Sequence, residues 1–272
     1  MIGFSKLGRL VIGAAVAATV TPAVSRAAVI YDAGTPTMTD EWTIGQPSGV
    51  HMDTVTAGAV YSDQTTFSGY AVYAGGNGTT KFTGMLADDI NTIATSPFTL
   101  AQFSWSIANG ASVAQTISPY IRFYDTTGTG GGPGNLLGGL NFNGISVASG
   151  NVAGFFYNAS ASAITLPPSF WACEFFSTTG SAANAEKIGQ GTFNPVDVGT
   201  SADEDFTSST VGTSSSSFVS ASPAGTVNVS PFAGTPVANF EWEFNPVPVP
   251  EPTSLGLLSV AAVFGLRRRR AI

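Results

Sequence analysis

The chain has 272 residues, a formal net charge of −7 at pH 7, and 10% charged against 43% hydrophobic residues. Between residues 28 and 248, three basic residues (Lys81, Arg122 and Lys187) stand against sixteen acidic ones, a net charge of −13. So little lysine and arginine cannot neutralise phosphates, which excludes nucleic acid and anionic lipid as partners of this body. The single cysteine, Cys173, excludes an intramolecular disulfide.

The N-terminus has the pattern of a secretory signal peptide. Lys6 and Arg9 are followed by the apolar run Leu10–Val20, and Ser25-Arg26-Ala27 fits a small-x-small cleavage site. We therefore expect residues 1–27 to be a signal peptide that is removed after Ala27, and the remainder of the chain to be exported.

Residues 28–244 alternate with period two and show almost no helical periodicity. Phe103, Trp105 and Ile107 alternate with polar residues, as do Phe240, Trp242 and Phe244, and both patterns predict half-buried strands. Leu86–Thr95 is the one segment where we expect a turn or two of helix. Further strands are expected at Gly58–Thr66, Tyr70–Ala74, Gln115–Asp125, Leu140–Val147, Gly154–Tyr157, Ser169–Ser177, Gln190–Phe193 and Thr226–Val229.

Short strands separated by glycine- and proline-rich turns, without a βαβ rhythm, predict an all-β body: an antiparallel β-sandwich of jelly-roll type. Tyr120–Asp125, Gly132–Leu137 and Leu166–Trp171 are together similar to jelly-roll-like modules of exported bacterial proteins. The low-complexity segment Thr207–Ser222 is expected to be a long exposed loop inside this domain. Cys173, in an apolar strand-like run, is expected to be buried and inert.

Catalytic groups are sparse. His51 is the single histidine and has no nucleophile elbow beside it, so we assign it no catalytic role. Glu174, Glu241 and Glu243 lie on predicted strands and carry the carboxylates that a glycosidase requires. In Glu241-Trp-Glu-Phe, however, the acids occupy the face opposite the aromatics, where strand acids are normally solvated. We predict that the body is not an enzyme and needs no cofactor.

Two binding functions stay open as alternatives. Asp88-Asp89, and Asp203-Glu204-Asp205 preceded by Asp197, supply hard oxygen ligands for calcium, although their spacing matches no established calcium loop and a solvated acidic loop is the simpler interpretation. Tryptophans provide stacking platforms for sugars. Trp105 and Trp242 alternate as core residues do, whereas Trp42 and Trp171, near turn-forming segments, are the better candidates for exposure.

The C-terminus is organised differently from the body. Residues 245–252 form a linker whose alternating prolines favour a semi-rigid polyproline II stalk. The uncharged run Thr253–Leu266 spans about 21 Å as a helix, short of a hydrocarbon core of about 30 Å, so it is a marginal transmembrane helix. A cluster of four arginines follows directly: Arg267, Arg268, Arg269 and Arg270. These residues would keep the end of the chain on the cytoplasmic side, so residues 253–272 are expected to be a short transmembrane helix with an arginine-rich cytoplasmic tail.

Val249-Pro250-Glu251-Pro252, the short apolar helix and the arginine cluster together resemble the PEP-CTERM sorting signal of bacterial exported proteins, a tail also known as the ice-binding protein C-terminal domain. The resemblance covers about residues 247–270. It implies that an exosortase, an integral-membrane peptidase, recognises Pro250, Glu251 and Pro252 and cuts near them. These residues would serve processing and are not an active site.

The sequence as a whole predicts an exported protein that is anchored by its C-terminal helix, then sorted to the cell surface or the extracellular matrix, with extracellular polysaccharide as a further partner. Its β domain is expected to be structural or interacting, and not enzymatic. A glycan-binding jelly-roll module, assisted by calcium, is the alternative, and a secreted carbohydrate-active enzyme is the third.

Overall fold

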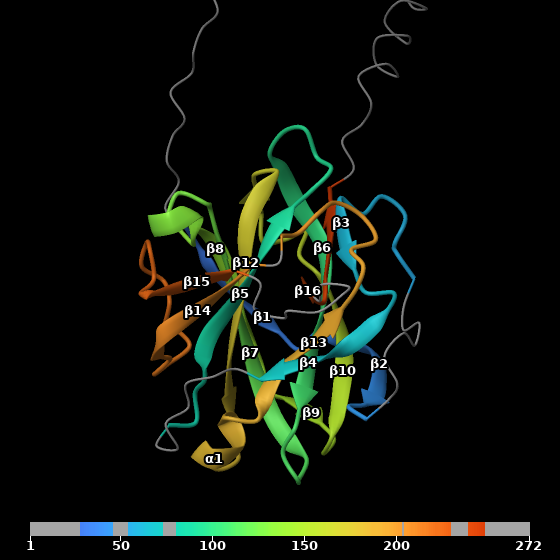
Figure 1. Cartoon of the computed structure of the whole chain (residues 1–272), viewed down its shortest axis with the longest axis vertical. Coiled ribbons are helices and arrows are strands. Elements are labelled where there is room, and N and C mark those ends of the chain that lie inside the picture. Colours follow the sequence, from blue (N-terminus) through green and yellow to red (C-terminus); the bar gives the residue numbers. More distant parts are fainter. Residues whose placement is uncertain (1–27, 46–53, 73–79, 203, 230–238, 248–272) are drawn as a thin grey trace, which may run out of the picture.

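The computed structural model describes residues 28–45, 54–72, 80–202, 204–229 and 239–247, and this part of the chain is almost entirely β (Figure 1). Its helices are one turn of α-helix, α1 at Ala182–Ala185, and one 3-10 turn at Thr129–Gly131. The helix that we predicted at Leu86–Thr95 is wrong, because Gly84–Asn91 forms the strand β5 in the middle of a sheet. No helix among the described residues is long and apolar enough to cross a membrane.

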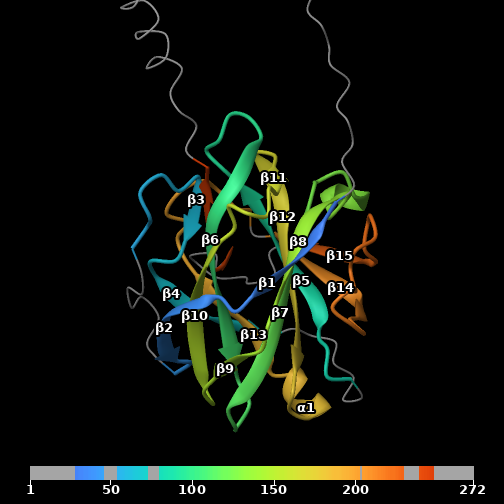
Figure 2. The same cartoon turned by 180° about the vertical axis from the view of Figure 1, so that it is seen from behind.

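The strands form two sheets. The first sheet has eight strands in the order β1-β8-β7-β12-β5-β14-β15, with β9 paired to β7. Its pairs are antiparallel except for β1 and β8, which run parallel and lie side by side in Figure 2. The bounds of its strands are β1 Ile30–Gly34, β5 Gly84–Asn91, β7 Gln115–Tyr124, β8 Leu136–Phe142, β9 Ile145–Val147, β12 Ser169–Thr178, β14 Glu204–Val211 and β15 Gly225–Val229.

The second sheet has nine strands. Its main order is β16-β13-β6-β10-β2, while β11 and β17 pair with β6, β3 pairs with β17, and β4 pairs with β13. The bounds of its strands are β2 Thr37–Thr43, β3 Tyr61–Asp63, β4 Phe67–Val72, β6 Phe98–Asn109, β10 Asn151–Asn158, β11 Thr165–Leu166, β13 Ile188–Phe193, β16 Asn239–Phe240 and β17 Trp242–Pro246.

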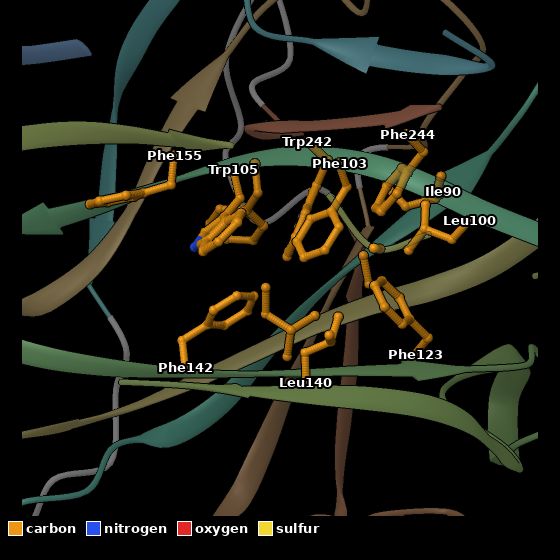
Figure 3. Close-up of a cluster of buried hydrophobic side chains, with 14 of the residues drawn as sticks. Ile90, Leu100, Phe103, Trp105, Phe123, Leu140, Phe142, Phe155, Trp242 and Phe244 are labelled. Carbon is orange, nitrogen blue, oxygen red and sulfur yellow. The ribbon is translucent and has the colours of Figure 1, made fainter. Parts of the chain in front are cut away.

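The main core lies between the two sheets (Figure 3). Aromatic rings of the second sheet, among them Phe103 and Trp105, point toward Phe123 and Phe142 of the first. The predicted alternation at residues 103–107 and 240–244 is confirmed here, since Phe103, Trp105 and Trp242 are almost completely buried. The expected two-layer β architecture is therefore present, with a parallel edge pair as a departure from a purely antiparallel sandwich.

The outer faces of both sheets are also covered. On the second sheet, Trp42, Phe67 and Phe193 pack edge to face in a smaller cluster. The outer face of the first sheet carries Tyr124 and Arg122. Two hydrogen bonds fix residues 212–224 over this face: the Tyr124 hydroxyl donates to the carbonyl of Phe218, and the Arg122 guanidinium donates to the carbonyl of Ser215. The serine-rich segment, expected as a loop, thus begins as part of β14 and continues as a cover of the sheet.

Candidate functional site

Oxygen atoms from three separate segments meet at the Ser201 hydroxyl. Its Oγ lies 3.1 Å from Oδ1 of Asp88, 3.0 Å from Oδ1 of Asp89 and 2.9 Å from Oδ1 of Asn239. The carbonyl oxygen of Ala202 is a fourth neighbour at 2.9 Å. Asp88 and Asp89 belong to β5 of the first sheet and Asn239 to β16 of the second, so this oxygen cluster connects the two sheets.

The backbone explains how Ser201 reaches this place. Thr200 forms a bridge with Asn91 at the end of β5, through reciprocal hydrogen bonds of 2.8 and 2.9 Å. The preceding residue, Gly199, has a φ of +83°, and a Cβ there would lie 2.6 Å from the carbonyl oxygen of Asn91. Because glycine has no Cβ and accepts positive φ, the chain turns tightly against β5 and places Ser201 beside the two aspartates.

The second oxygen of each aspartate is held by backbone and side-chain N–H groups. The backbone N–H of Phe240 donates to Oδ2 of Asp88 at 3.1 Å. Oδ2 of Asp89 accepts from the backbone N–H of Ala202 at 3.0 Å and from the Asn91 side chain at 3.1 Å. These bonds orient both carboxylates so that their Oδ1 atoms turn toward Ser201.

Two further polar side chains, both on β3, influence the cluster: Tyr61 lies near Ser201, and the charge of Asp63 acts on Asp88. The hydroxyl of Tyr61 and both carboxylate oxygens of Asp63 are buried without a hydrogen-bond partner, and each residue is 0% exposed. Burial raises the pKa of the Tyr61 hydroxyl well above its ordinary value, and the nearby Ser201 hydroxyl offsets a small part of this rise without forming a hydrogen bond of good geometry. Asp63 is paired with Trp242 across the sheet, so its side chain shares the inner face with that ring.

Burial dominates the electrostatics of this region. Loss of solvation raises the pKa of Asp88 and Asp63 well above the ordinary value, and raises that of Asp89 to about 6. Neighbouring charges act in the same direction: Asp89 and Asp63 raise the pKa of Asp88, while Asp197 and Glu241 raise that of Asp63. Burial, and then the charges of Asp88, Asp63 and Asp89, also raise the pKa of Tyr61. The site thus brings together acidic groups that are costly to ionise side by side.

The prediction that Glu241 and Glu243 face solvent is wrong, because they are 3% and 1% exposed. Glu243 accepts hydrogen bonds from the backbone of Thr56 (2.9 Å) and from the side chains of Gln64 (2.8 Å) and Asn245 (2.9 Å). Glu174 is likewise buried, between the core residues of β12. All three carboxylates therefore lie inside the fold and not on its surface.

Of the four predictions on tryptophan burial, two are confirmed and two are wrong. Trp105 and Trp242 are core residues, as expected, whereas the expected exposure of Trp42 and Trp171 is wrong, since they are 6% and 1% exposed. Trp171 packs with Phe206 on the outer face of the first sheet, and its Nε1 donates to the carbonyl of Gly131 at 2.9 Å. Cys173 is buried as predicted, and burial raises the pKa of its thiol.

Among the described acidic residues that we considered for calcium, only Asp88 and Asp89 join a cluster of oxygens from several segments. Asp197 caps the turn at Gln64 and Thr65, and Asp205 pairs with Asn228. Sequence reasoning missed Ser201 and Asn239, because nothing in their spacing connects them to β5. Across the described ranges, no group of three or more His, Cys, Asp and Glu side chains is arranged to hold a metal ion.

Several predicted positions lie outside the described residues. They are His51, Asp203, the signal-cleavage residue Ala27, the sorting residues Pro250, Glu251 and Pro252, and the cluster Arg267, Arg268, Arg269 and Arg270.

Comparison with known proteins addresses the tail directly. No curated protein and no solved structure matches the chain. A family model described as the PEP-CTERM protein-sorting motif matches residues 248–270, the segment for which the resemblance was inferred. The chain therefore carries at its C-terminus a sorting motif of the PEP-CTERM family, which marks an exported protein that is sorted by an exosortase.

Proposed function

We propose that the chain is a protein of the bacterial cell surface or extracellular matrix, and that its β body acts there as a non-enzymatic structural or interaction domain. The observation that carries this proposal is the sorting motif at residues 248–270. Exosortases are membrane proteins, so processing through this motif delivers the body to the outer side of a membrane.

The two ends of the chain have complementary roles in this proposal. Residues 1–27 start export as a signal peptide. Thr253–Leu266 then holds the chain in the membrane as a short helix, and the arginine cluster fixes its end on the cytoplasmic side. Cleavage near Pro250, Glu251 and Pro252 releases the body, which joins the envelope or the polysaccharide layer around the cell.

Two observations on the body support a non-enzymatic role, namely the burial of the candidate side chains and the lining of a surface cavity. The tryptophans expected to stack on sugars are buried, and the strand glutamates are held inside the fold. A surface cavity of about 310 Å³ is lined by residues 210–224, none of which is ionisable. The strand order bears on the fold class and not on this role: β5, β7 and β12 lie in the first sheet and β6, β10 and β13 in the second, which favours a jelly-roll-like classification.

The test follows an epitope-tagged chain in a bacterium that has an exosortase. We expect the released form to begin after Ala27 and to lack the arginine cluster, as read by mass spectrometry of both ends. Glu251→Gln, or deletion of Arg267–Arg270, should leave export intact and abolish release. Glu186→Gln, which removes a partly exposed carboxylate of the body, is the matched control and should be processed normally.

Two results would overturn the proposal. Recovery of the intact arginine-tailed chain from the mature cell surface would refute processing. For the body, the purified chain is applied to a glycan array with and without calcium; selective glycan binding would replace the structural role by that of a glycan-binding module, and release of a sugar product would make it an enzyme.

A further inference from the structure

We propose that Asp88, Asp89, Ser201, Ala202 and Asn239 form a calcium-binding site that ties the two sheets of the body together. The proposal concerns the folded body alone and is independent of how the tail is processed.

The spacing of the oxygens is the first argument. Four oxygen atoms surround Ser201 Oγ at 2.9–3.1 Å. Calcium binds six to eight oxygens at about 2.3–2.6 Å, which places neighbouring ligand oxygens roughly this far apart. The five oxygens comprise two carboxylates, one amide, one hydroxyl and one backbone carbonyl, the mixture that calcium accepts, and water would complete the shell.

The balance of donors and acceptors is the second argument. A serine hydroxyl carries one proton, so it satisfies one of the four surrounding acceptors. Two of the three basic side chains of the body are engaged away from the cluster. Lys81 donates to the carbonyl of Thr179, and Arg122 donates to Asn141 and to the carbonyl of Ser215. A divalent cation would neutralise the two aspartates and satisfy all five oxygens together.

Buried polar groups of β3 also lie in this region. Tyr61 and Asp63 are completely buried, and neither the Tyr61 hydroxyl nor the Asp63 carboxylate makes a hydrogen bond. The Tyr61 hydroxyl lies beside Ser201, and Asp63 is near enough to Asp88 for its charge to raise the pKa of that carboxyl. Buried polar groups in proteins are almost always paired with protein, water or an ion. The unpaired Tyr61 hydroxyl beside Ser201 is a buried polar group that an ion and its bound water at the cluster would satisfy.

The choice of calcium follows from the ligand types. Hard oxygen ligands without sulfur or imidazole exclude a preference for zinc or copper. Magnesium demands near-ideal octahedral geometry and keeps most of its water, which a partly buried site with a backbone carbonyl does not suit. The proposed site has two carboxylates, and its other ligands are neutral oxygens. This agrees with the finding that the described residues contain no group of three or more His, Cys, Asp and Glu side chains arranged around a metal position.

Calcium at this position would act as a cross-link. Asp88 and Asp89 lie on β5 of the first sheet, Asn239 on β16 of the second, and Ser201 on the segment that β5 fixes through Thr200. A protein exported to calcium-containing surroundings would therefore gain stability after leaving the cell, since a ligand that binds only the folded state stabilises it.

The test uses the full-length chain, purified in detergent and stripped with a chelator. Calorimetric titration with calcium should show one site with a Kd of about 10⁻⁴–10⁻³ M, the range of extracellular calcium modules. Calcium at a hundredfold excess over Kd should raise Tm by about 5–10 °C. Absence of both the binding heat and the Tm shift would overturn the site, and a response to magnesium alone would overturn the assignment to calcium.

Variants locate the site. Asp89→Asn should weaken calcium binding about tenfold or more, because ligand charge sets the affinity. Asp32→Asn, the same change at an exposed position of β1, should leave it within about twofold of the unchanged chain. Asn239→Asp adds a third carboxylate and should tighten calcium binding about tenfold. A folding defect would weaken binding, so a gain in affinity reports on the site itself. Affinities unchanged in both Asp89→Asn and Asn239→Asp would refute this location.

Discussion

Replacement of Asp63 by asparagine tests the cost of the buried acids. Asp63 is 0% exposed, makes no hydrogen bond through either oxygen, and lies on the inner face of the second sheet. Burial is the main cause of its raised pKa, followed by the charges of Asp197 and Glu241. Asparagine has nearly the same shape and carries no charge, so the substitution removes the ionisation and leaves the packing.

The sign follows from proton linkage. Because the pKa of Asp63 is higher in the folded than in the unfolded chain, the folded state holds its proton more tightly. Its contribution to stability is fully present below the unfolded pKa of about 3.9 and is lost as pH rises through the folded pKa. One such group gives a slope of at most about 1.4 kcal/mol per pH unit. Burial also raises the pKa values of Asp88 and Asp89, so each of them adds a slope of the same sign.

We therefore expect the chelator-treated chain to lose stability between pH 5 and pH 8, and Asp63→Asn to lose less. At pH 8 the variant should be more stable by about 1–3 kcal/mol, because the amide does not ionise and each unit of raised pKa costs the aspartate about 1.4 kcal/mol; this gain corresponds to a few degrees in Tm. Thermal unfolding followed by circular dichroism across this pH range is the assay, with Asp32→Asn as the exposed control. A variant that kept the full pH slope, or that was less stable at pH 8, would refute the reasoning.

Three other predictions concern the packing of the first sheet. Tyr124→Phe removes the hydrogen bond to Phe218 and should cost about 1 kcal/mol, with faster proteolysis within residues 212–224; unchanged proteolysis would contradict the covering role of this segment. Gly139→Ala places a Cβ 2.6 Å from a backbone oxygen and should lower the Tm by several degrees, whereas Gly45→Ala, with nothing within 4 Å, should not; equal effects would speak against the close strand packing. Cys173 should react with thiol reagents only after unfolding, and rapid labelling of the folded chain would contradict its burial.

The alternation of apolar residues predicted strands well where a strand is long and its aromatic residues face the main core. Gln115–Tyr124 and Ser169–Thr178 were located almost to the residue, because both supply rings and aliphatic side chains to that core. Leu86–Thr95 failed for the opposite reason. Met85 and Ala87 face one apolar cluster while Leu86 and Ile90 face the other, so a strand covered on both sides loses its alternation.

The sequence indicates two of the residues in the oxygen cluster but not their partners. The adjacent pair Asp88-Asp89 is visible in the sequence as a source of hard ligands, but its partners come from residues 201, 202 and 239. Their approach depends on the bridge between Thr200 and Asn91 and on the pairing of β16 with β13. Contacts between segments more than a hundred residues apart are set by the tertiary fold, and no local spacing encodes them.

The buried glutamates show the limit of period-two reasoning in physical terms. Alternation at residues 240–244 correctly separates Trp242 from Glu241 and Glu243, but it states only which side chains share a face. Whether that face meets water depends on what covers it, and here Gln64 and Thr56 reach Glu243 from a segment almost two hundred residues away. The body has a net charge of −13 and nevertheless buries carboxylates on both sides of a sheet. Each of these carboxylates has to be neutralised or hydrogen-bonded, because an unpaired buried charge is costly. Glu243 is satisfied by amide donors, burial raises the pKa of Asp63 and so favours its neutral form, and the Asp88-Asp89 pair has the geometry to be neutralised by a cation.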